Sequence, residues 1–256
     1  MLNPRVTLGV SLKAYFGNRQ ATDWIERVAD ITTRASAVES GTVEVFIAPT
    51  YLQIHHALAV FAGSNVRVAA QDVSVEEPGP ATGEVTAAEL AEIGVSMTEI
   101  GHAERRERYG ETDEIVNRKT VAALRHGLTP LICLGESERL HPDAAADSVI
   151  AQLRTALTDA PNGRVIVAYE PVWAIGKSDP APLEHIRRVT DRLRSYLTAR
   201  DSREGSSVLY GGSAGPGLLT ELGNDVDGLF LGRFAHQPEA FERVLTEASR
   251  LAEGVA

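Results

Sequence analysis

The stretch around Glu170 carries residue types suited to the transfer of a proton. Residues 165–169 form an apolar run that predicts a buried strand, and Glu170 stands at its carboxyl end. Pro171 ends the strand, and the small residues that follow, up to Pro180, form a segment that can move. A base on a rigid strand end, followed by a mobile lid, suits a reaction that removes a proton and excludes water. A surface loop with a solvated glutamate is the alternative that these residues alone leave open.

Lys13 and His102 also follow apolar runs, at residues 6–12 and 97–100. His102 directly precedes a helix-like stretch, and a helix N-terminus disfavours a protonated imidazole. A neutral His102 can donate a proton to a carbonyl oxygen, whereas a capping or packing histidine is the alternative. Glu104 can pair with Lys13 or with Arg105, and a structural salt bridge accounts for it at least as well as a chemical role.

Two glycine-rich turns follow the last two apolar runs. They are Gly211-Gly212-Ser213 and Gly232-Arg233. Such turns let backbone N–H groups approach an anion closely, and the hydroxyl of Ser213 can add a donor. Tight turning explains such glycines in isolation, but their position after these runs favours a phosphate site. Ser213 lacks the Gly-x-Ser-x-Gly pattern of a nucleophile elbow, so we do not expect acyl transfer.

The elements that must position these side chains repeat along the chain. Eight apolar runs of strand length lie at residues 6–12, 43–48, 66–70, 97–100, 131–134, 165–169, 208–210 and 228–231. Segments with the three-four spacing of amphipathic helices lie between or after them, at residues 24–38, 115–126, 149–157, 186–197 and 241–251. The alternatives are a closed barrel and a doubly wound sheet.

The length and the count of units favour the barrel. The chain has 256 residues, close to the ~250 typical of a (β/α)8 TIM barrel. No Gly-x-Gly-x-x-Gly follows the first run, which counts against a dinucleotide-binding sheet. No linker-like run divides the chain, so we expect one domain over residues 1–256. In such a barrel the strand ends meet at one mouth, where Lys13, His102 and Glu170 should converge.

The composition bounds the partners. A net charge of −10 argues against a nucleic-acid partner, and an anionic substrate would need local cations. No apolar run reaches the roughly 18 residues of a membrane span, so we expect no membrane partner. Cys133 is the only cysteine, which excludes an internal disulfide and favours a cytoplasmic protein. No His, Cys and Asp residues have metal-ligand spacing, so we expect no metal and no other cofactor.

Three motifs of this chain resemble those of the triosephosphate isomerase family. They are Gly101-His102-Ala103-Glu104-Arg105-Arg106, Ala168-Tyr169-Glu170-Pro171-Val172-Trp173-Ala174-Ile175-Gly176 and Tyr210-Gly211-Gly212-Ser213. The likeness runs nearly end to end, and the Glu-Pro-Val-Trp-Ala-Ile-Gly motif is highly specific. The family is a worked case of a glutamate base, a neutral histidine and a closing loop.

The resemblance implies roles for four catalytic residues. Glu170 is the base that moves a proton between adjacent carbons. His102 is the electrophile that polarises the carbonyl and relays protons on oxygen. Lys13 holds the enediolate and the phosphate, and Glu104 supports the site.

The resemblance also implies how a small phosphorylated sugar is bound. Main-chain phosphate donors are expected at the positions of Gly176, Ser213, Gly232 and Arg233. Residues 171–179 are the lid, which keeps water away and prevents loss of phosphate from the intermediate. Thr82 matches a residue on a loop that enters the neighbouring subunit, so the resemblance implies a homodimer.

The chain departs from the family pattern around the substrate. Ser11 stands where the family has Asn, Ala103 where it has Ser, and Arg233 where it has Gly; the lid ends in Lys177-Ser178-Asp179 in place of Thr-Gly-Lys. Ser11 opens space near the carbonyl end of the substrate. Arg233 adds a long cation beside the phosphate turn, although its side chain can equally fold outward.

Ser11 and the Gly232-Arg233 pair are similar to a sister group, the tetrulose-phosphate isomerases of erythritol catabolism. These interconvert L-erythrulose 1-phosphate and D-erythrulose 4-phosphate, so a hydroxymethyl group replaces one hydrogen of the triose. We favour this reading over a glycolytic triosephosphate isomerase, which interconverts dihydroxyacetone phosphate and glyceraldehyde 3-phosphate. A barrel that binds a sugar phosphate without turning it over is a third reading, which the intact Lys13, His102 and Glu170 disfavour.

Overall fold

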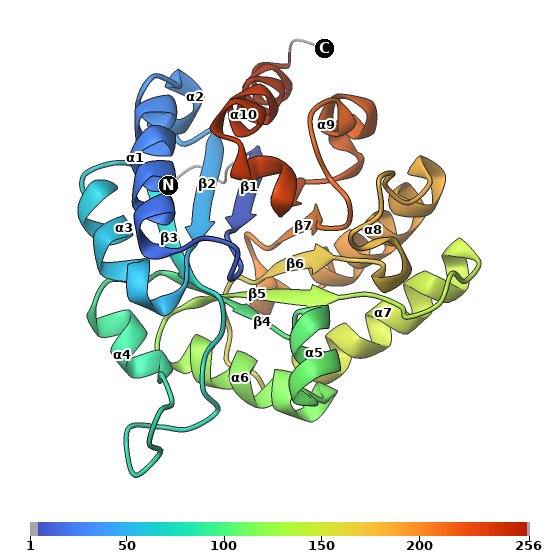
Figure 1. Ribbon diagram of the computed structural model, residues 1–256. Coiled ribbons are helices and arrows are strands. Elements are labelled where there is room, and N and C mark those ends of the chain that lie inside the picture. The colour runs from blue at the N-terminus through green and yellow to red at the C-terminus, as the bar shows by residue number, and fades with distance from the viewer. Residues whose placement is uncertain (1–4, 255–256) are drawn as a thin grey trace.

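The computed structural model describes residues 5–254. Eight parallel strands close into one barrel in the order β1 to β8, with helices outside it (Figure 1). The strands are β1 (Val6–Ser11), β2 (Val43–Ala48), β3 (Val66–Ala70), β4 (Met97–Ile100), β5 (Thr129–Leu134), β6 (Ile166–Tyr169), β7 (Ser207–Tyr210) and β8 (Gly228–Leu231). The predicted (β/α)8 barrel is confirmed, and each predicted apolar run overlaps one strand.

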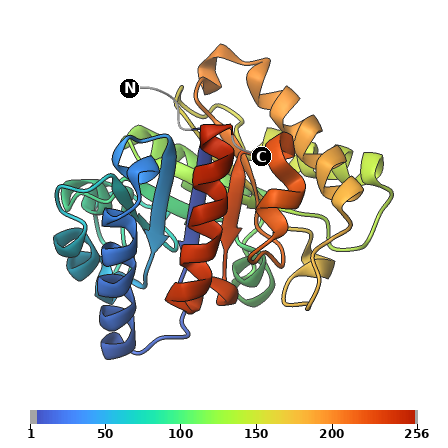
Figure 2. The same ribbon diagram turned by 90° about the horizontal axis from the view of Figure 1, so that it is seen from above.

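The helices follow the strands and cover the outside of the barrel. They are α1 (Asn18–Thr33), α2 (Ser36–Glu39), α3 (Ile54–Val60), α4 (Ala87–Glu92), α5 (Ala103–Tyr109), α6 (Asp113–Arg125), α7 (Pro142–Ala156), α8 (Leu183–Thr198), α9 (Leu218–Leu222) and α10 (Pro238–Glu253). The helix α10, drawn in red in Figure 2, lies against β1 and contacts both α1 and α9. None of the helices between residues 5 and 254 combines the length and the apolar character needed to cross a bilayer.

The prediction of one helix over residues 24–38 was wrong. The chain forms α1 and the short α2 instead, with Arg34 and Ala35 between them. Ala35 then takes an extended conformation, with φ −94° and ψ 102°, which separates the two helices.

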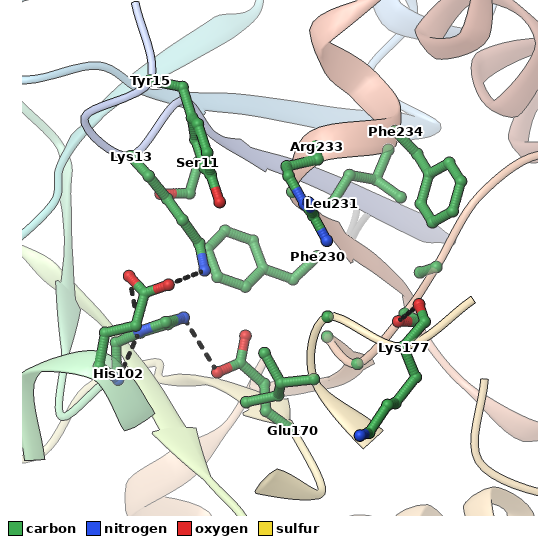
Figure 3. Close-up of a pocket in the computed structure, with 18 residues that line it drawn as sticks. Ser11, Lys13, Tyr15, His102, Glu170, Lys177, Phe230, Leu231, Arg233 and Phe234 are labelled. Atoms are coloured by element: carbon green, nitrogen blue, oxygen red, sulfur yellow. Dashed lines mark hydrogen bonds and ion pairs between the residues drawn. The ribbon is translucent and has the colours of Figure 1, made fainter. Parts of the chain in front are cut away.

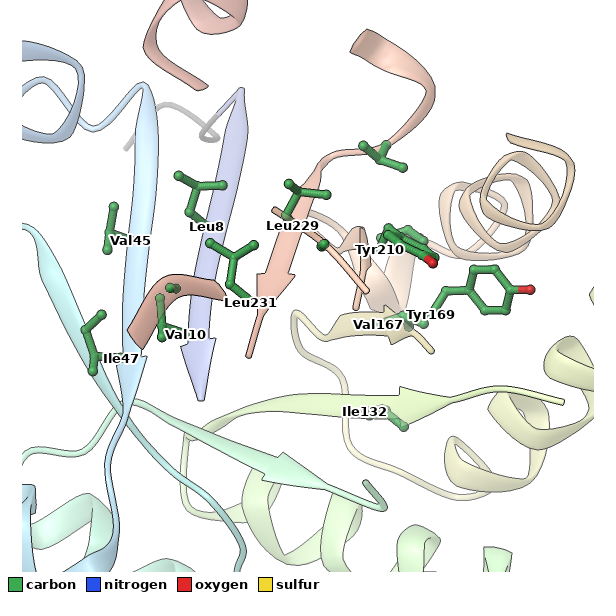
Figure 4. Close-up of a cluster of buried hydrophobic side chains, with 14 of the residues drawn as sticks. Leu8, Val10, Val45, Ile47, Ile132, Val167, Tyr169, Tyr210, Leu229 and Leu231 are labelled. Atoms are coloured by element: carbon green, nitrogen blue, oxygen red, sulfur yellow. The ribbon is translucent and has the colours of Figure 1, made fainter. Parts of the chain in front are cut away.

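The strand side chains alternate between two apolar layers. Leu8 and Val10 of β1 point outward and pack with Val45 and Ile47 of β2 in the layer under the helices (Figure 4). The inner layer fills the barrel; its members are Phe46, Ala48, Ala69, Met97, Leu131, Cys133, Ile166, Ala168, Leu209 and Phe230. Gly9 makes room for this layer, since a Cβ there would lie 2.0 Å from the ring of Phe46.

The loops after the strands gather at one end of the barrel. The longest of the early ones joins β3 to α4 and projects away from the barrel (Figure 1). Thr82 lies on this loop and is exposed. The remaining loops from β1, β4, β6, β7 and β8 surround a common cavity.

Candidate active site

A cavity of about 360 Å³ opens at the carboxyl ends of the strands. Its size lies in the range of small-molecule sites. All nine residues singled out from the sequence line it: Ser11, Lys13, His102, Glu104, Glu170, Gly176, Ser213, Gly232 and Arg233. Figure 3 shows Lys13 and Arg233 entering the cavity from one side and His102 and Glu170 from the other. The geometry therefore brings the predicted residues together, while their roles stay predictions.

Lys13 is held in an unusual backbone conformation at the end of β1. Its φ is +48°, a left-handed value that costs a residue other than glycine free energy. The side-chain amide of Gln71 donates to the Lys13 carbonyl at 3.0 Å and fixes this turn. The ammonium of Lys13 lies 2.9 Å from Oε1 of Glu104. Burial opposes the charge, but this bond and the nearby carboxylate of Glu170 outweigh it and raise the pKa of Lys13.

His102 caps α5 and is buried, with 4% of its surface exposed. Its Nδ1 accepts a hydrogen bond from the backbone N–H of Glu104 at 3.1 Å. The remaining ring proton is therefore assigned to Nε2, which faces the cavity. Burial and the positive charge of Lys13 lower the pKa of His102, so a neutral imidazole is the stable form. This form can donate a hydrogen bond to a carbonyl oxygen.

Glu170 follows β6 and projects into the cavity from the side facing His102 (Figure 3). Its Oε2 lies 3.5 Å from Nε2 of His102 and has no hydrogen-bond partner among residues 5–254. Two glycines give it room: a Cβ at Gly135 would lie 1.9 Å from the Glu170 carbonyl oxygen, and one at Gly211 would lie 2.8 Å from its Cγ. Burial raises the pKa of Glu170 to about 8, with Lys13 opposing the shift. A carboxylate this basic can accept a proton from carbon.

The predicted phosphate end of the cavity is formed by the loops after β6, β7 and β8. Arg233, whose direction the sequence left open, points into the cavity (Figure 3). Its Nη2 would lie 3.8 Å from a Cβ placed on Gly176 of the lid. No carboxylate between residues 5 and 254 lies within the 4.0 Å of an ion pair with Arg233. Its positive charge is thus available to an anionic substrate.

The lid segment is held at both ends by buried groups. Glu136 accepts hydrogen bonds from the indole N–H of Trp173 at 2.7 Å and from the Tyr169 hydroxyl at 3.1 Å. At the far end, the backbone N–H of Ala181 donates to the Tyr210 hydroxyl at 3.0 Å. Ser213 donates its hydroxyl to the carbonyl of Lys177 at 2.7 Å. The Ser213 side chain therefore ties the loop after β7 to residue 177 of the predicted lid, and its backbone N–H remains the group expected to meet phosphate.

The sequence reading missed two residues of this region. Tyr15 lies two residues beyond Lys13 and also lines the cavity, although 55% of it is exposed. Glu99 lies on β4, is 4% exposed, and accepts a hydrogen bond from the Ser11 hydroxyl at 3.1 Å. A single charged residue within the strand run 97–100 was the available signal for Glu99. Burial raises its pKa to about 7, against the opposing effects of Lys13 and Ser11.

Side chains that could together bind a metal ion do not gather in the described part of the chain. Between residues 5 and 254, no three His, Cys, Asp or Glu side chains are arranged to hold one. Glu104, one of the carboxylates of the cavity, instead pairs with the ammonium of Lys13.

Known proteins similar to this chain place it in a family. The sequence model described as triosephosphate isomerase matches residues 6–248. An L-erythrulose-1-phosphate isomerase of Pectobacterium atrosepticum is 44% identical over 255 residues, which cover 98% of each chain. One of Rhizobium etli is 37% identical over 254 residues, or 95% of this chain and 92% of the relative.

A solved structure agrees with these matches. The crystal structure of the triosephosphate isomerase of Bartonella henselae superposes with a TM-score of 0.81 at 29% sequence identity, covering 96% of this chain and 99% of that one. Because the family match and the relatives extend over nearly the whole chain, this protein is an isomerase that belongs to the triosephosphate isomerase family.

Proposed function

We propose that this isomerase interconverts L-erythrulose 1-phosphate and D-erythrulose 4-phosphate. The observation that carries the proposal is the convergence of Lys13, His102 and Glu170 at one cavity whose flanking positions hold Ser11 and Arg233. The name of the Pectobacterium relative, 44% identical over nearly the full length, supports the same substrate. The nine cavity residues named above are the proposed site.

The proposed reaction moves a carbonyl by one carbon. Glu170 removes the proton from the carbon next to the carbonyl, on the side away from the phosphate. The electrons form an enediolate, whose oxygens take hydrogen bonds from Nε2 of His102 and from the ammonium of Lys13. Glu170 then returns the proton to the former carbonyl carbon, and the proton on oxygen is relayed through His102. No atom is gained or lost.

The charges around the cavity suit this chemistry. A phosphate dianion needs cations in a protein of net charge −10, and Lys13 and Arg233 both line the cavity. A neutral His102 donates without holding the enediolate as an ion pair. Closure of residues 171–179 would keep water from the intermediate and so prevent loss of its phosphate.

The second candidate is the triosephosphate isomerase reaction, which belongs to glycolysis. The Bartonella structure carries that name and matches 96% of this chain. The same Lys13, His102 and Glu170 would serve it, since the carbonyl shift is the same. A barrel that binds a sugar phosphate without turning it over is the third candidate, and the intact proton-transfer residues count against it.

A turnover assay with both substrates separates these candidates. We expect kcat/KM for L-erythrulose 1-phosphate to exceed that for dihydroxyacetone phosphate by at least about tenfold, since one carbon group in a pocket changes binding by ~1–3 kcal/mol. The reverse preference would support the triose reaction. Binding of both without turnover would support the third candidate.

The wider setting follows from the same proposal. The enzyme would act in erythritol catabolism, in the cytoplasm, as one domain. We also propose a homodimer, because Thr82 lies exposed on the projecting loop that follows β3. Sedimentation of the purified protein tests the dimer, and removal of the loop tip should give monomers.

A further inference from the structure

Ser11 and Glu99 form a buried hydrogen-bonded pair at the bottom of the cavity. The hydroxyl of Ser11 donates to Oε2 of Glu99 at 3.1 Å, although 88 residues separate the two in sequence. Ser11 is 2% exposed and lines the cavity, and Glu99 is 4% exposed. Met97, two residues before Glu99, faces the apolar interior, so Glu99 also points into the barrel.

A carboxylate at this depth costs free energy, and its side-chain hydrogen bond is with Ser11 and not with Lys13, His102 or Glu170. Removing a carboxylate from water is unfavourable unless other groups compensate. The charge of Glu99 also contributes to the raised pKa of Glu170, so it affects the base without contacting it. An apolar residue fills the preceding inward position, Met97. The chain thus carries a buried carboxyl at a position where an apolar side chain would satisfy packing alone.

The bond fixes which kind of partner Ser11 can meet. A serine hydroxyl has one proton and two lone pairs. When Glu99 is ionised and the Ser11 proton is directed to it, Ser11 presents only lone pairs to the cavity, and therefore selects a group that donates a hydrogen bond. A carbonyl or enediolate oxygen is an acceptor and does not fit this position. A substrate hydroxyl does.

The position of the pair in the barrel indicates which hydroxyl this is. In the closed strand order, β4 lies opposite β8, whose end carries Gly232 and Arg233. Ser11 itself ends β1, which pairs with β8, but its hydroxyl points across the barrel to Glu99 on β4, away from the proposed phosphate turn. A buried carboxylate there also repels a phosphate dianion, which favours the orientation with phosphate toward Arg233. The group near Ser11 is then the end of the substrate away from phosphate.

We propose that Ser11, positioned by Glu99, binds the hydroxyl of the terminal hydroxymethyl group that distinguishes the tetrulose phosphate from the triose phosphate. The inference rests on the proposed function, because the triose has a hydrogen at this place. Ser11 is the contact and Glu99 is a positioning residue that keeps the Ser11 oxygen an acceptor. Specificity then comes from a hydrogen bond as well as from space.

The test compares L-erythrulose 1-phosphate with its analogue that carries a methyl in place of the terminal hydroxymethyl group. The ratio of the two kcat/KM values measures the benefit of the hydroxyl. We expect this ratio to be about tenfold or more in the wild type, the size of one good hydrogen bond. Ser11→Ala and Glu99→Met should both bring it close to one. Glu99→Gln keeps an oxygen that can accept from Ser11 and should restore part of the ratio.

Thr7→Val is the matched control. Thr7 is also on β1 and also donates its hydroxyl to a buried carboxylate, Oε2 of Glu44 at 3.2 Å. This pair lies at the other end of the barrel, so its loss should leave the ratio unchanged even if stability falls. If Glu99 served packing alone, Glu99→Met would lower kcat/KM equally for L-erythrulose 1-phosphate and for the methyl analogue. The small change Ser11→Ala decides the matter if Glu99→Met does not fold.

Two failures are distinguishable. If the wild type does not turn over L-erythrulose 1-phosphate, the proposed function fails and this inference fails with it. If the wild type turns it over, but the ratio is near one or is the same in wild type and Ser11→Ala, only the inference is overturned.

Discussion

Nε2 of His102 lies 3.5 Å from Oε2 of Glu170, and the two residues come from the ends of β4 and β6. The separation is too long for a good hydrogen bond, and Oε2 has no other partner among residues 5–254. One group is a donor by its tautomer and the other an acceptor, so a substrate can meet both. The backbone N–H of Glu104 maintains this arrangement by occupying Nδ1, which leaves the His102 proton on the side of the base.

We expect Glu170→Gln to abolish most turnover while leaving phosphate binding intact. The amide keeps the size of the carboxylate but accepts no proton, so kcat/KM should fall by the ~10²–10⁴-fold typical of one acid or base, or by more. Inhibition by phosphoglycolate should persist. Near-native turnover of the variant would require a different base and would remove Glu170 from the site.

The same substitution should change how stability depends on pH. The carboxyl ionises near its ordinary pKa of 4.5 in the unfolded chain, but burial raises its pKa to about 8 in the folded protein. Between these values the folded wild type binds the proton and the unfolded chain does not, so the wild type loses stability as pH rises. Glu170→Gln lacks this loss.

The Tm of Glu170→Gln minus that of the wild type should therefore grow from about pH 5 to about pH 8. A change of ~1 kcal/mol in the free energy of unfolding shifts Tm by about 2–4 °C in a chain of this size, and we expect the difference to grow by at least that much. Thermal unfolding without ligand measures it. A difference that stays constant over this pH range would mean that the Glu170 pKa is not raised by folding.

Lys13→Met should weaken both substrate binding and turnover. Lys13 forms an ion pair with Glu104 and its charge acts on His102, and it is proposed to contact the enediolate and the phosphate. We expect a higher KM, a lower kcat and weaker inhibition by phosphoglycolate. Lys177→Met serves as a comparison, because it removes the same charge from the proposed lid at the edge of the same cavity, from a side chain whose ammonium points away from Lys13 (Figure 3). Equal effects of the two variants would argue for a general loss of charge.

The barrel and the predicted site residues at the strand ends could be predicted from sequence because each depends on a short segment of the chain, a strand and the residues that follow it. A buried strand followed by a polar residue places that residue at the mouth, which is how Glu170 and His102 were found. Glu99 was missed because its proposed role depends on a hydrogen bond with Ser11, which lies on another strand. The direction of Arg233 was likewise open, since it depends on the packing of the lid and not on nearby sequence.

The helix over residues 24–38 shows the limit of periodicity. Its apolar spacing continued past the end of α1, and the pattern could not register the extended conformation of Ala35. One residue with extended dihedral angles ends a helix without changing the apolar pattern. The predicted catalytic residues were unaffected, because they follow strands.

The last prediction concerns substrate size, which Ser11 and Arg233 should affect in different ways. Ser11→Asn fills space near the proposed hydroxymethyl group and should shrink the preference for the tetrulose phosphate, mostly by lowering its kcat/KM. Arg233→Gly removes a cation that points into the cavity. It should lower kcat/KM for both substrates by the same factor, because phosphate is common to them. The measurement is kcat/KM for L-erythrulose 1-phosphate and dihydroxyacetone phosphate on the wild type and both variants. An Arg233→Gly variant that changes the ratio, or a Ser11→Asn variant that does not, would mean that these residues do not divide size and phosphate recognition between them.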